Sequence, residues 1–133
     1  TAKATAQWPL GEGGTKLRLG GELGYAPNTP RRDAMNSGTG SADSLSWQAS
    51  LNFMDIRPGH HLGIVYGWVA DGWLISSDFR PNDTLAEVRW VWQATPAWQL
   101  DARLRRRQEI DLPATASQAR RDDDLYVRAT LRF

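Results

Sequence analysis

Apolar and polar side chains alternate, residue by residue, along most of this chain. In the closing segment Leu125, Val127, Ala129, Leu131 and Phe133 occupy every second position, and mostly polar residues fill the positions between them. Successive side chains of an extended strand point to opposite faces, so this pattern predicts a strand with one apolar and one polar face. An amphipathic helix is a poor alternative, because polar residues interrupt every i, i+3, i+4 stripe.

The same alternation recurs through the rest of the sequence. The segments that carry it are 1–8, 15–25, 44–53, 61–68, 85–93, 98–110 and 122–133. They run about 8–12 residues, near the 9–11 that a tilted strand needs to cross a bilayer. The sequence therefore predicts an all-β fold with about seven antiparallel strands.

The connections between these segments are of two kinds. Short Gly- and Pro-containing turns at 11–14, 55–60 and 94–97 alternate strictly with long polar loops at 26–43, 70–84 and 111–124. All short turns would then lie at one end of the strands and all long loops at the other. Outer-membrane β-barrels have this arrangement, whereas a soluble meander has no reason to sort its loops by length.

The aromatic residues gather at the predicted strand ends. Those beside short turns are Trp8, Phe53, Trp92, Trp98 and Phe133, and those beside long loops are Tyr25, Trp47 and Trp68. This distribution predicts two aromatic girdles, one at each membrane interface. Trp90 does not fit it, and Trp73 and Phe79, in a long loop, could fold inward or pack on the rim.

Composition and motifs exclude several classes of protein. A net charge of +1 offers no global field for nucleic acid, and no apolar run is long enough for a spanning helix. The chain has no Cys, and His60 and His61, being adjacent, would point to opposite faces of a strand. No nucleophile set or carboxylate pair in an evident cleft is found. We expect no enzymatic activity, no metal, no cofactor and no nucleic-acid partner.

The chain resembles the C-terminal portion of a Gram-negative outer-membrane porin. The resemblance rests on the terminal Phe133, on Leu131, Val127 and Leu125 behind it, and on the loop rhythm. The stretches "GHHLGIVYGW" and "RPNDTLAEVRWVW" and the Arg-rich segment 98–110 are similar, more narrowly, to the phosphate-selective porin O and P family. The resemblance implies an antiparallel transmembrane β-barrel in the bacterial outer membrane. It also implies that the barrel-assembly machinery reads the Phe133 ending, and it leaves homotrimer formation open.

The number of predicted strands departs from the porin pattern. Seven is odd, whereas bacterial single-chain barrels have even numbers, and an open sheet leaves two unpaired edges. We therefore expect residues 1–133 to form the C-terminal portion of one outer-membrane β-barrel domain, with nine further strands completing it if the barrel has 16. An overlooked eighth strand around "GWLISSDF" is the alternative, but it would break the loop rhythm.

The polar face carries the functional signal. Its basic residues are Lys3, Lys16, Arg18, Arg89, Arg103, Arg105, Arg107, Arg128 and Arg132, and its acidic residues are Glu22, Glu87, Asp101, Glu109 and Asp124. Arg103, Arg105 and Arg107 would form a ladder with steps of about 6.6 Å. Such rungs could pass an anion from one to the next, and guanidinium groups suit phosphate or carboxylate. The same alternation sends Arg106 toward lipid.

These charges have three readings, and the chain has three candidate functions. The charges could stiffen the barrel wall, favour anions along a pathway, or form a specific phosphate site. The leading function is a channel for passive diffusion of small hydrophilic solutes, with a basic lumen that favours anionic ones. The alternatives are a translocator or anchor barrel without open-pore transport, and a soluble β-rich module whose Trp residues stack on carbohydrate.

Overall fold

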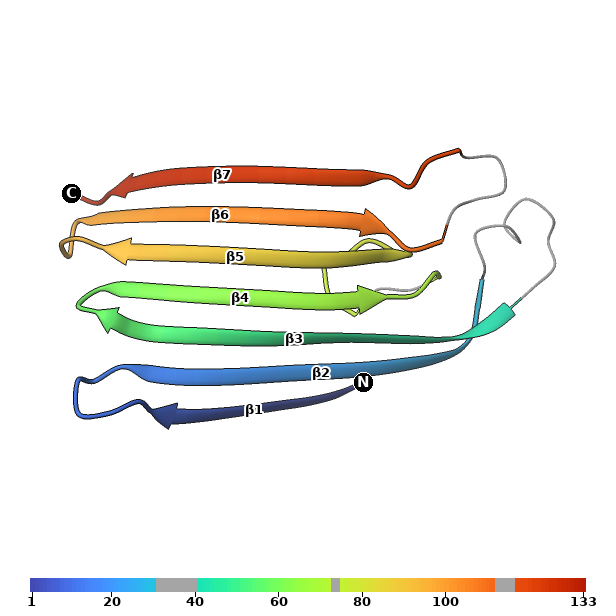
Figure 1. The fold of residues 1–133 in the computed structure, drawn as a ribbon, viewed down its shortest axis with the longest axis horizontal. Helices are drawn as coiled ribbons and strands as arrows, with labels where there is room; N and C mark the ends of the chain where they lie inside the picture. The colour runs from blue at the N-terminus through green and yellow to red at the C-terminus, as the bar shows by residue number, and fades with distance from the viewer. Residues whose placement is uncertain (31–40, 73–74, 112–116) are drawn as a thin grey trace.

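The computed structural model describes residues 1–30, 41–72, 75–111 and 117–133; for residues 30, 41 and 42 only the backbone is described. Its seven strands are β1 (Ala2–Pro9), β2 (Lys16–Pro30), β3 (Ser41–Arg57), β4 (His60–Val69), β5 (Asp83–Gln93), β6 (Trp98–Glu109) and β7 (Arg121–Leu131). They form one antiparallel sheet in the order of the chain, with β1 and β7 at its edges (Figure 1). Within the described ranges no helix is long and apolar enough to cross a membrane.

The strand register confirms the predicted alternation. One row of residues paired from strand to strand runs Trp8, Leu17, Phe53, Leu62, Trp90, Ala102 and Val127. A second row runs Ala6, Leu19, Leu51, Ile64, Val88, Leu104 and Leu125. Since paired residues point to the same face of a sheet, the apolar residues of all seven strands share one face.

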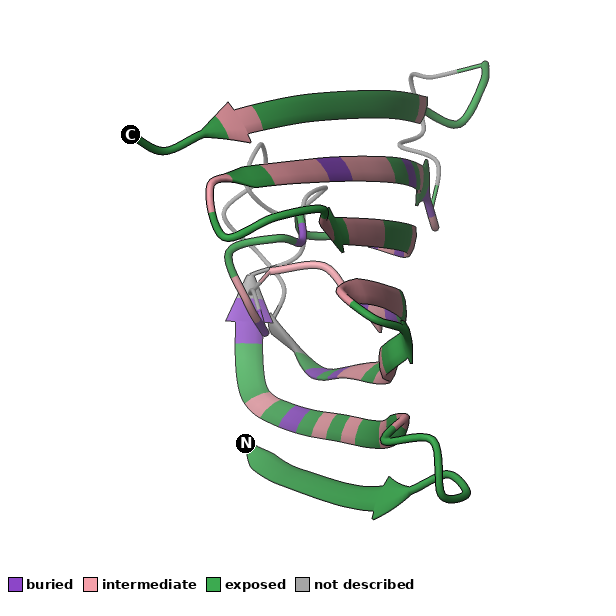
Figure 2. Ribbon diagram, turned by 90° about the vertical axis from the view of Figure 1, so that its left-hand side faces the viewer, coloured by how far each residue is buried: buried purple, intermediate pink, exposed green. Residues whose placement is uncertain are grey.

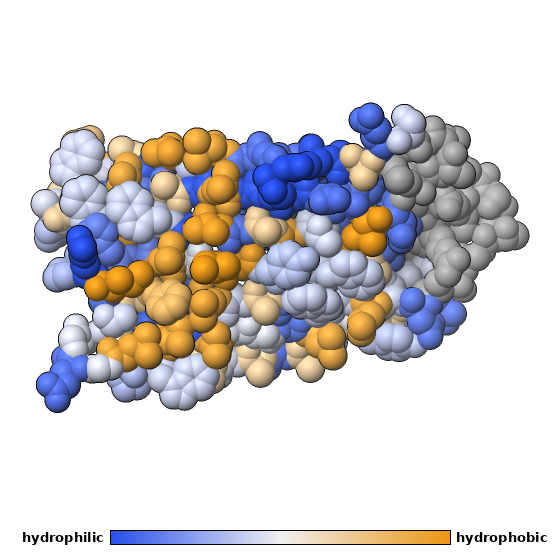
Figure 3. Space-filling view, viewed as in Figure 1, coloured by the Kyte–Doolittle hydropathy of each residue, from blue (hydrophilic) through white to orange (hydrophobic). Residues whose placement is uncertain are grey.

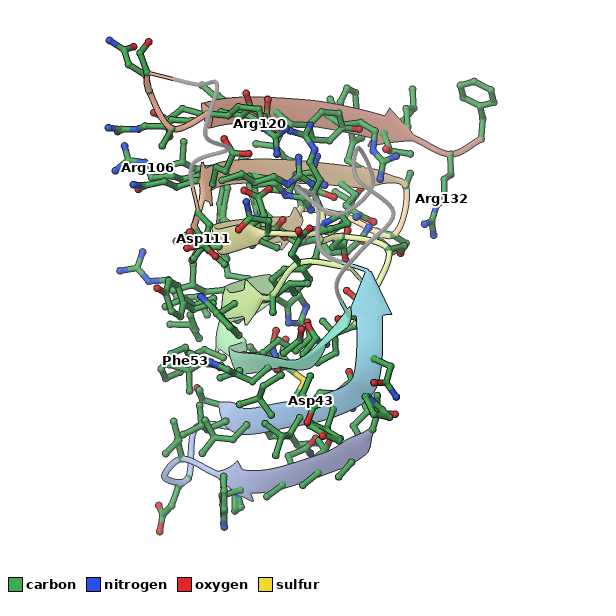
Figure 4. The ribbon with its side chains drawn as sticks, turned by 90° about the vertical axis from the view of Figure 1, so that its right-hand side faces the viewer. Asp43, Phe53, Arg106, Asp111, Arg120 and Arg132 are labelled. Atoms are coloured by element: carbon green, nitrogen blue, oxygen red, sulfur yellow. The ribbon has the colours of Figure 1, made fainter. Side chains whose placement is uncertain are left out.

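The sheet is strongly curved, and the apolar rows lie on its convex side. Figures 2 and 4 view the sheet from its two ends and show its curvature. In Figure 4 the labelled Phe53 projects outward from the convex side. Figure 3 shows this face as a band of apolar side chains across the strands. Leu125 is 76% exposed and Val127 is 61% exposed, so these residues do not gather in a compact core.

Short and long connections lie at opposite ends of the sheet, as the sequence predicts. The turns between β1 and β2, β3 and β4, and β5 and β6 lie together at the left of Figure 1. At the other end the strands are longer than the sequence indicates, since β2 continues to Pro30, β3 starts at Ser41 and β7 starts at Arg121. The predicted loops 26–43 and 111–124 are therefore wrong at their boundaries. Backbone pairing outweighs the polar composition there, as in the pairs Thr29↔Ala42 and Gln108↔Arg121.

The connection between β4 and β5 folds onto the concave face. Its described residues, 70–72 and 75–82, contain no strand, so the eighth strand considered around "GWLISSDF" is not found there. Phe79 is buried against Gly67, where a Cβ atom would run into the Phe79 ring. Val69, Ile75 and Leu85 complete the apolar cluster of the described residues. Phe79 thus takes the inward position of the two that the sequence left open, and Trp73 lies outside the described residues.

Trp90 belongs to an aromatic cluster at the short-turn end of the convex face. Its indole Nε1 donates a hydrogen bond to Nδ1 of His60 at 3.2 Å. The His60 ring also stacks on Trp92, with 5.4 Å between the ring centroids. His61 instead lies 3.9 Å from the carboxylate of Asp55. The two histidines therefore have separate surroundings, as their adjacency predicts.

Candidate functional site

A group of arginines surrounds one carboxylate on the concave face, at the middle of β5, β6 and β7. Asp101 is 2% exposed and accepts hydrogen bonds from Nε of Arg89, at 3.1 Å, and from its Nη2. Nη2 of Arg128, the residue opposite Asp101 on β7, lies 3.7 Å from the same carboxylate. We call Arg89, Asp101, Arg103, Tyr126 and Arg128 the arginine cluster.

Arg103 and Tyr126 complete the arginine cluster. Arg103 lies opposite Arg89 on β5 and opposite Tyr126 on β7. The guanidinium carbons of Arg103 and Arg128 lie 5.2 Å and 5.9 Å from the centroid of the Tyr126 ring. The ring thus orders both cations by cation–π contact. The cluster contains three guanidinium groups and one carboxylate, so it keeps a net positive charge.

Arg103 also holds an unused donor. Its Nε is buried and has no hydrogen-bond partner among the described residues. A buried donor without a partner is costly, but Nε of Arg107 is a second such atom on β6, so this feature alone does not mark a solute site. Forked guanidinium donors match carboxylate and phosphate oxygens. The arginine cluster is therefore chemically suited to a small oxyanion.

Arg105 and Arg107 attach the β4–β5 connection to the sheet instead. Arg105 is buried, and its Nε donates to the Glu87 carboxylate at 2.6 Å while its Nη2 donates to Asp78 at 3.3 Å. Nη2 of Arg107 donates to the backbone carbonyl of Asp78 at 2.9 Å. Of the predicted ladder, Arg103 thus belongs to the arginine cluster, and Arg105 and Arg107 hold the β4–β5 connection.

Lys16, Arg18 and Arg132 lie away from the arginine cluster. Lys16 and Arg18 are exposed on β2, and Arg132 follows β7, where its backbone N–H bonds to Ala97. Arg18 lines a pocket of about 230 Å³ beneath the β4–β5 connection, together with Lys3, Glu22, Asp78 and Glu87. Its mixed charges, with Lys3 near Glu22 at 3.9 Å, give it no basic character.

Sequence reasoning missed two residues of this face. Tyr126 interrupts the polar side of the β7 alternation with an aromatic ring, and that exception was a readable signal. Asp78 carried no signal, because its partners depend on how the β4–β5 connection folds.

The residues expected to form the assembly signal lie along the free edge of the sheet. Leu125, Val127 and Leu131 are exposed on the convex side of β7, and Phe133 extends fully exposed beyond its end. No described element pairs with the outer edge of β7. Their side chains are therefore accessible, and their role in assembly stays a prediction.

Comparisons with known proteins place the chain in no family. A scan against protein-family models, a search of curated proteins and a search of solved structures found no significant match. Within the described residues, no group of three or more His, Asp or Glu side chains could hold a metal ion. The chain forms an all-β, seven-stranded antiparallel open sheet.

Proposed function

We propose that this chain forms part of the wall of an antiparallel β-barrel in the bacterial outer membrane, and that the barrel passes small hydrophilic solutes with a preference for anions. The observation that carries the proposal is the separation of the two faces. Apolar residues of seven strands stay exposed on the convex side, while charged residues line the concave side. In a barrel wall these faces would meet lipid and water respectively.

The open edges support a larger assembly. β1 and β7 each pair on one side among the described strands. Unpaired backbone groups are costly in hydrocarbon, so a membrane-spanning sheet has to close into a barrel. Further strands would therefore pair with β1 and β7, and the exposed Phe133 ending would engage the barrel-assembly machinery, as the porin resemblance implies.

The concave face supports passage of solutes through a lumen that the β4–β5 connection narrows. The β4–β5 connection would occupy part of the lumen, fixed there by Phe79 and by the contacts of Asp78. The arginine cluster lies on the neighbouring strands, with Arg89 and Arg128 about half-exposed. A passing anion would meet several weak cationic contacts, which permit both entry and release. The same inward connection favours a second candidate, an anchor barrel whose lumen is closed.

Removing the positive charge of the arginine cluster is expected to reduce the preference for anions. In the triple variant Arg89→Gln, Arg103→Gln, Arg128→Gln, the anion-to-cation permeability ratio should fall roughly tenfold, because a unit charge about 4 Å away contributes about 1 kcal/mol even in water. The measurement is the reversal potential of the intact barrel in a planar bilayer under a salt gradient.

Arg57→Gln is the control for this experiment. It removes one charge at the exposed short-turn end of β3, outside the arginine cluster, and should leave the reversal potential unchanged. If the unaltered barrel prefers cations and the triple variant keeps that preference, the result would contradict the anion channel. A barrel that inserts but shows no steady conductance would favour the closed anchor instead.

A further inference from the structure

Three charged side chains lie together on the mainly apolar convex face. Nε of Arg106 donates to Asp123 at 2.7 Å, and Nε of Arg121 lies 3.2 Å from the same carboxylate. Arg106 and Asp123 are paired directly across β6 and β7. Figure 4 shows Arg106 projecting from the convex side, and Figure 3 shows a hydrophilic patch beside the apolar band. We call Arg106, Arg121 and Asp123 the outer charged triad.

The outer charged triad keeps a net positive charge and free donors. One carboxylate holds two guanidinium groups, and the side chains of Arg106 and Arg121 are 57% and 54% exposed. Because Asp123 occupies the Nε positions, it fixes both side chains and leaves their outer donors accessible. Pairs of forked guanidinium donors bind phosphate with good geometry.

An apolar groove begins at the outer charged triad. It has a volume of about 470 Å³, and its lining includes Ile64, Tyr66, Ala86, Val88 and Leu104, with Arg106 and Asp123 at one end. Ala86 lies opposite both Tyr66 on β4 and Arg106 on β6, so its small side chain leaves a hollow between larger neighbours. Arg106 lines the groove, and Arg121 is held beside it through Asp123, so the groove matches the shape and polarity of an amphiphile with an acidic head.

We propose that this groove binds one acyl chain of a membrane lipid and that Arg106 and Arg121 hold the phosphate of its headgroup. The proposal rests on the proposed function, which places the convex face in lipid. A pair that served only to join β6 and β7 would need one arginine, whereas the second arginine leaves a charge to be balanced. Because an apolar groove lies beside this charge, we expect the group that balances it to be the phosphate of a lipid rather than a free anion.

The test is lipid retention by the intact barrel in a neutral detergent, titrated with phosphatidic acid and followed by native mass spectrometry. The double variant Arg106→Gln, Arg121→Gln is expected to bind phosphatidic acid about thirtyfold more weakly. Diacylglycerol, which lacks the phosphate, should bind the unaltered barrel weakly and should not distinguish the two proteins.

Two further variants separate the head from the chain. Lys16→Gln, Arg18→Gln removes the same charge from the concave face and should leave phosphatidic acid binding unchanged. Ala86→Leu keeps both arginines but fills the groove, and should weaken binding of phosphatidic acid. Inorganic phosphate, added as a competitor, should not displace the lipid. The Ala86→Leu variant also carries the test if the arginine variant does not fold.

The outcomes distinguish this site from the pore. Equal phosphatidic acid binding by the arginine variant and the unaltered barrel would overturn the proposal. So would displacement of the lipid by inorganic phosphate together with normal binding by Ala86→Leu, since the site would then bind free anions. Lipid binding that follows the predicted pattern in a barrel without conductance would retain the lipid site and reject the channel.

Discussion

The Val88→Arg variant is expected to lose about 2–4 kcal/mol of folding free energy in a lipid bilayer, the cost of an arginine on the lipid face near the bilayer midplane. Val88 lies in the second apolar row, between Ile64 and Leu104, and has no charged partner in either neighbouring strand position. Its side chain is exposed on the convex face. Urea unfolding of the intact barrel in lipid vesicles, followed by tryptophan fluorescence, measures the change.

Val65→Arg is the matched control for this substitution. Val65 lies next to Ile64 on β4, at the same level of the sheet, but points to the concave side, opposite Ser50 and Glu87. Arginine there would enter the polar pocket that Val65 helps to line, near the carboxylates of Glu22 and Glu87, so the loss should be clearly smaller than that of Val88→Arg. Equal losses in the two variants would contradict the assignment of the convex face to lipid.

The Phe79→Ala variant is expected to release the β4–β5 connection from the concave face. Truncation of a buried phenylalanine costs about 3–5 kcal/mol, and Phe79 is 4% exposed among Val69, Ile75 and Leu85. The sheet itself does not depend on this contact, so the loss should appear as local opening. Amide hydrogen exchange in residues 75–82 should accelerate by roughly 100-fold or more.

The control removes a phenylalanine ring from the convex face instead. Phe53→Ala deletes a phenylalanine from the convex apolar row and should leave exchange in residues 75–82 unchanged. If the proposed lumen is narrowed by this connection, single-channel conductance should rise in Phe79→Ala alone. Unchanged exchange in Phe79→Ala would show that Asp78 and its arginine contacts hold the connection without the ring.

The strands and their two faces could be predicted from sequence because both follow from local periodicity. In β7, Leu125 and Val127 read as apolar-side residues from the sequence and lie exposed on the convex side in the structure. The short turns could equally be predicted from sequence, since Gly and Pro specify them locally. The longer ends of β2, β3 and β7 were not, because there cross-strand pairing extends strands through Asn-, Ser- and Asp-rich sequence.

Contacts between distant segments explain what the sequence could not predict. Arg103, Arg105 and Arg107 look equivalent along β6, but Asp78 engages only the latter two. Arg106 looked misplaced on the apolar side, yet the register brings Asp123 directly opposite it. From the sequence Gly67 is an ordinary strand glycine, but in the structure Phe79 packs against it and leaves no room for a Cβ atom. Each of these roles depends on a partner whose position only the folded sheet defines.

The most direct test of the account is the sidedness of β7 in the membrane. The chain has no cysteine, so single cysteines placed in turn at Asp124, Leu125, Tyr126, Val127 and Arg128 in the intact barrel can carry a spin label. We expect labels at Leu125 and Val127 to collide with oxygen dissolved in lipid, and labels at the other three positions to collide with a water-soluble nickel complex. Equal access of the nickel complex to all five positions would contradict the account.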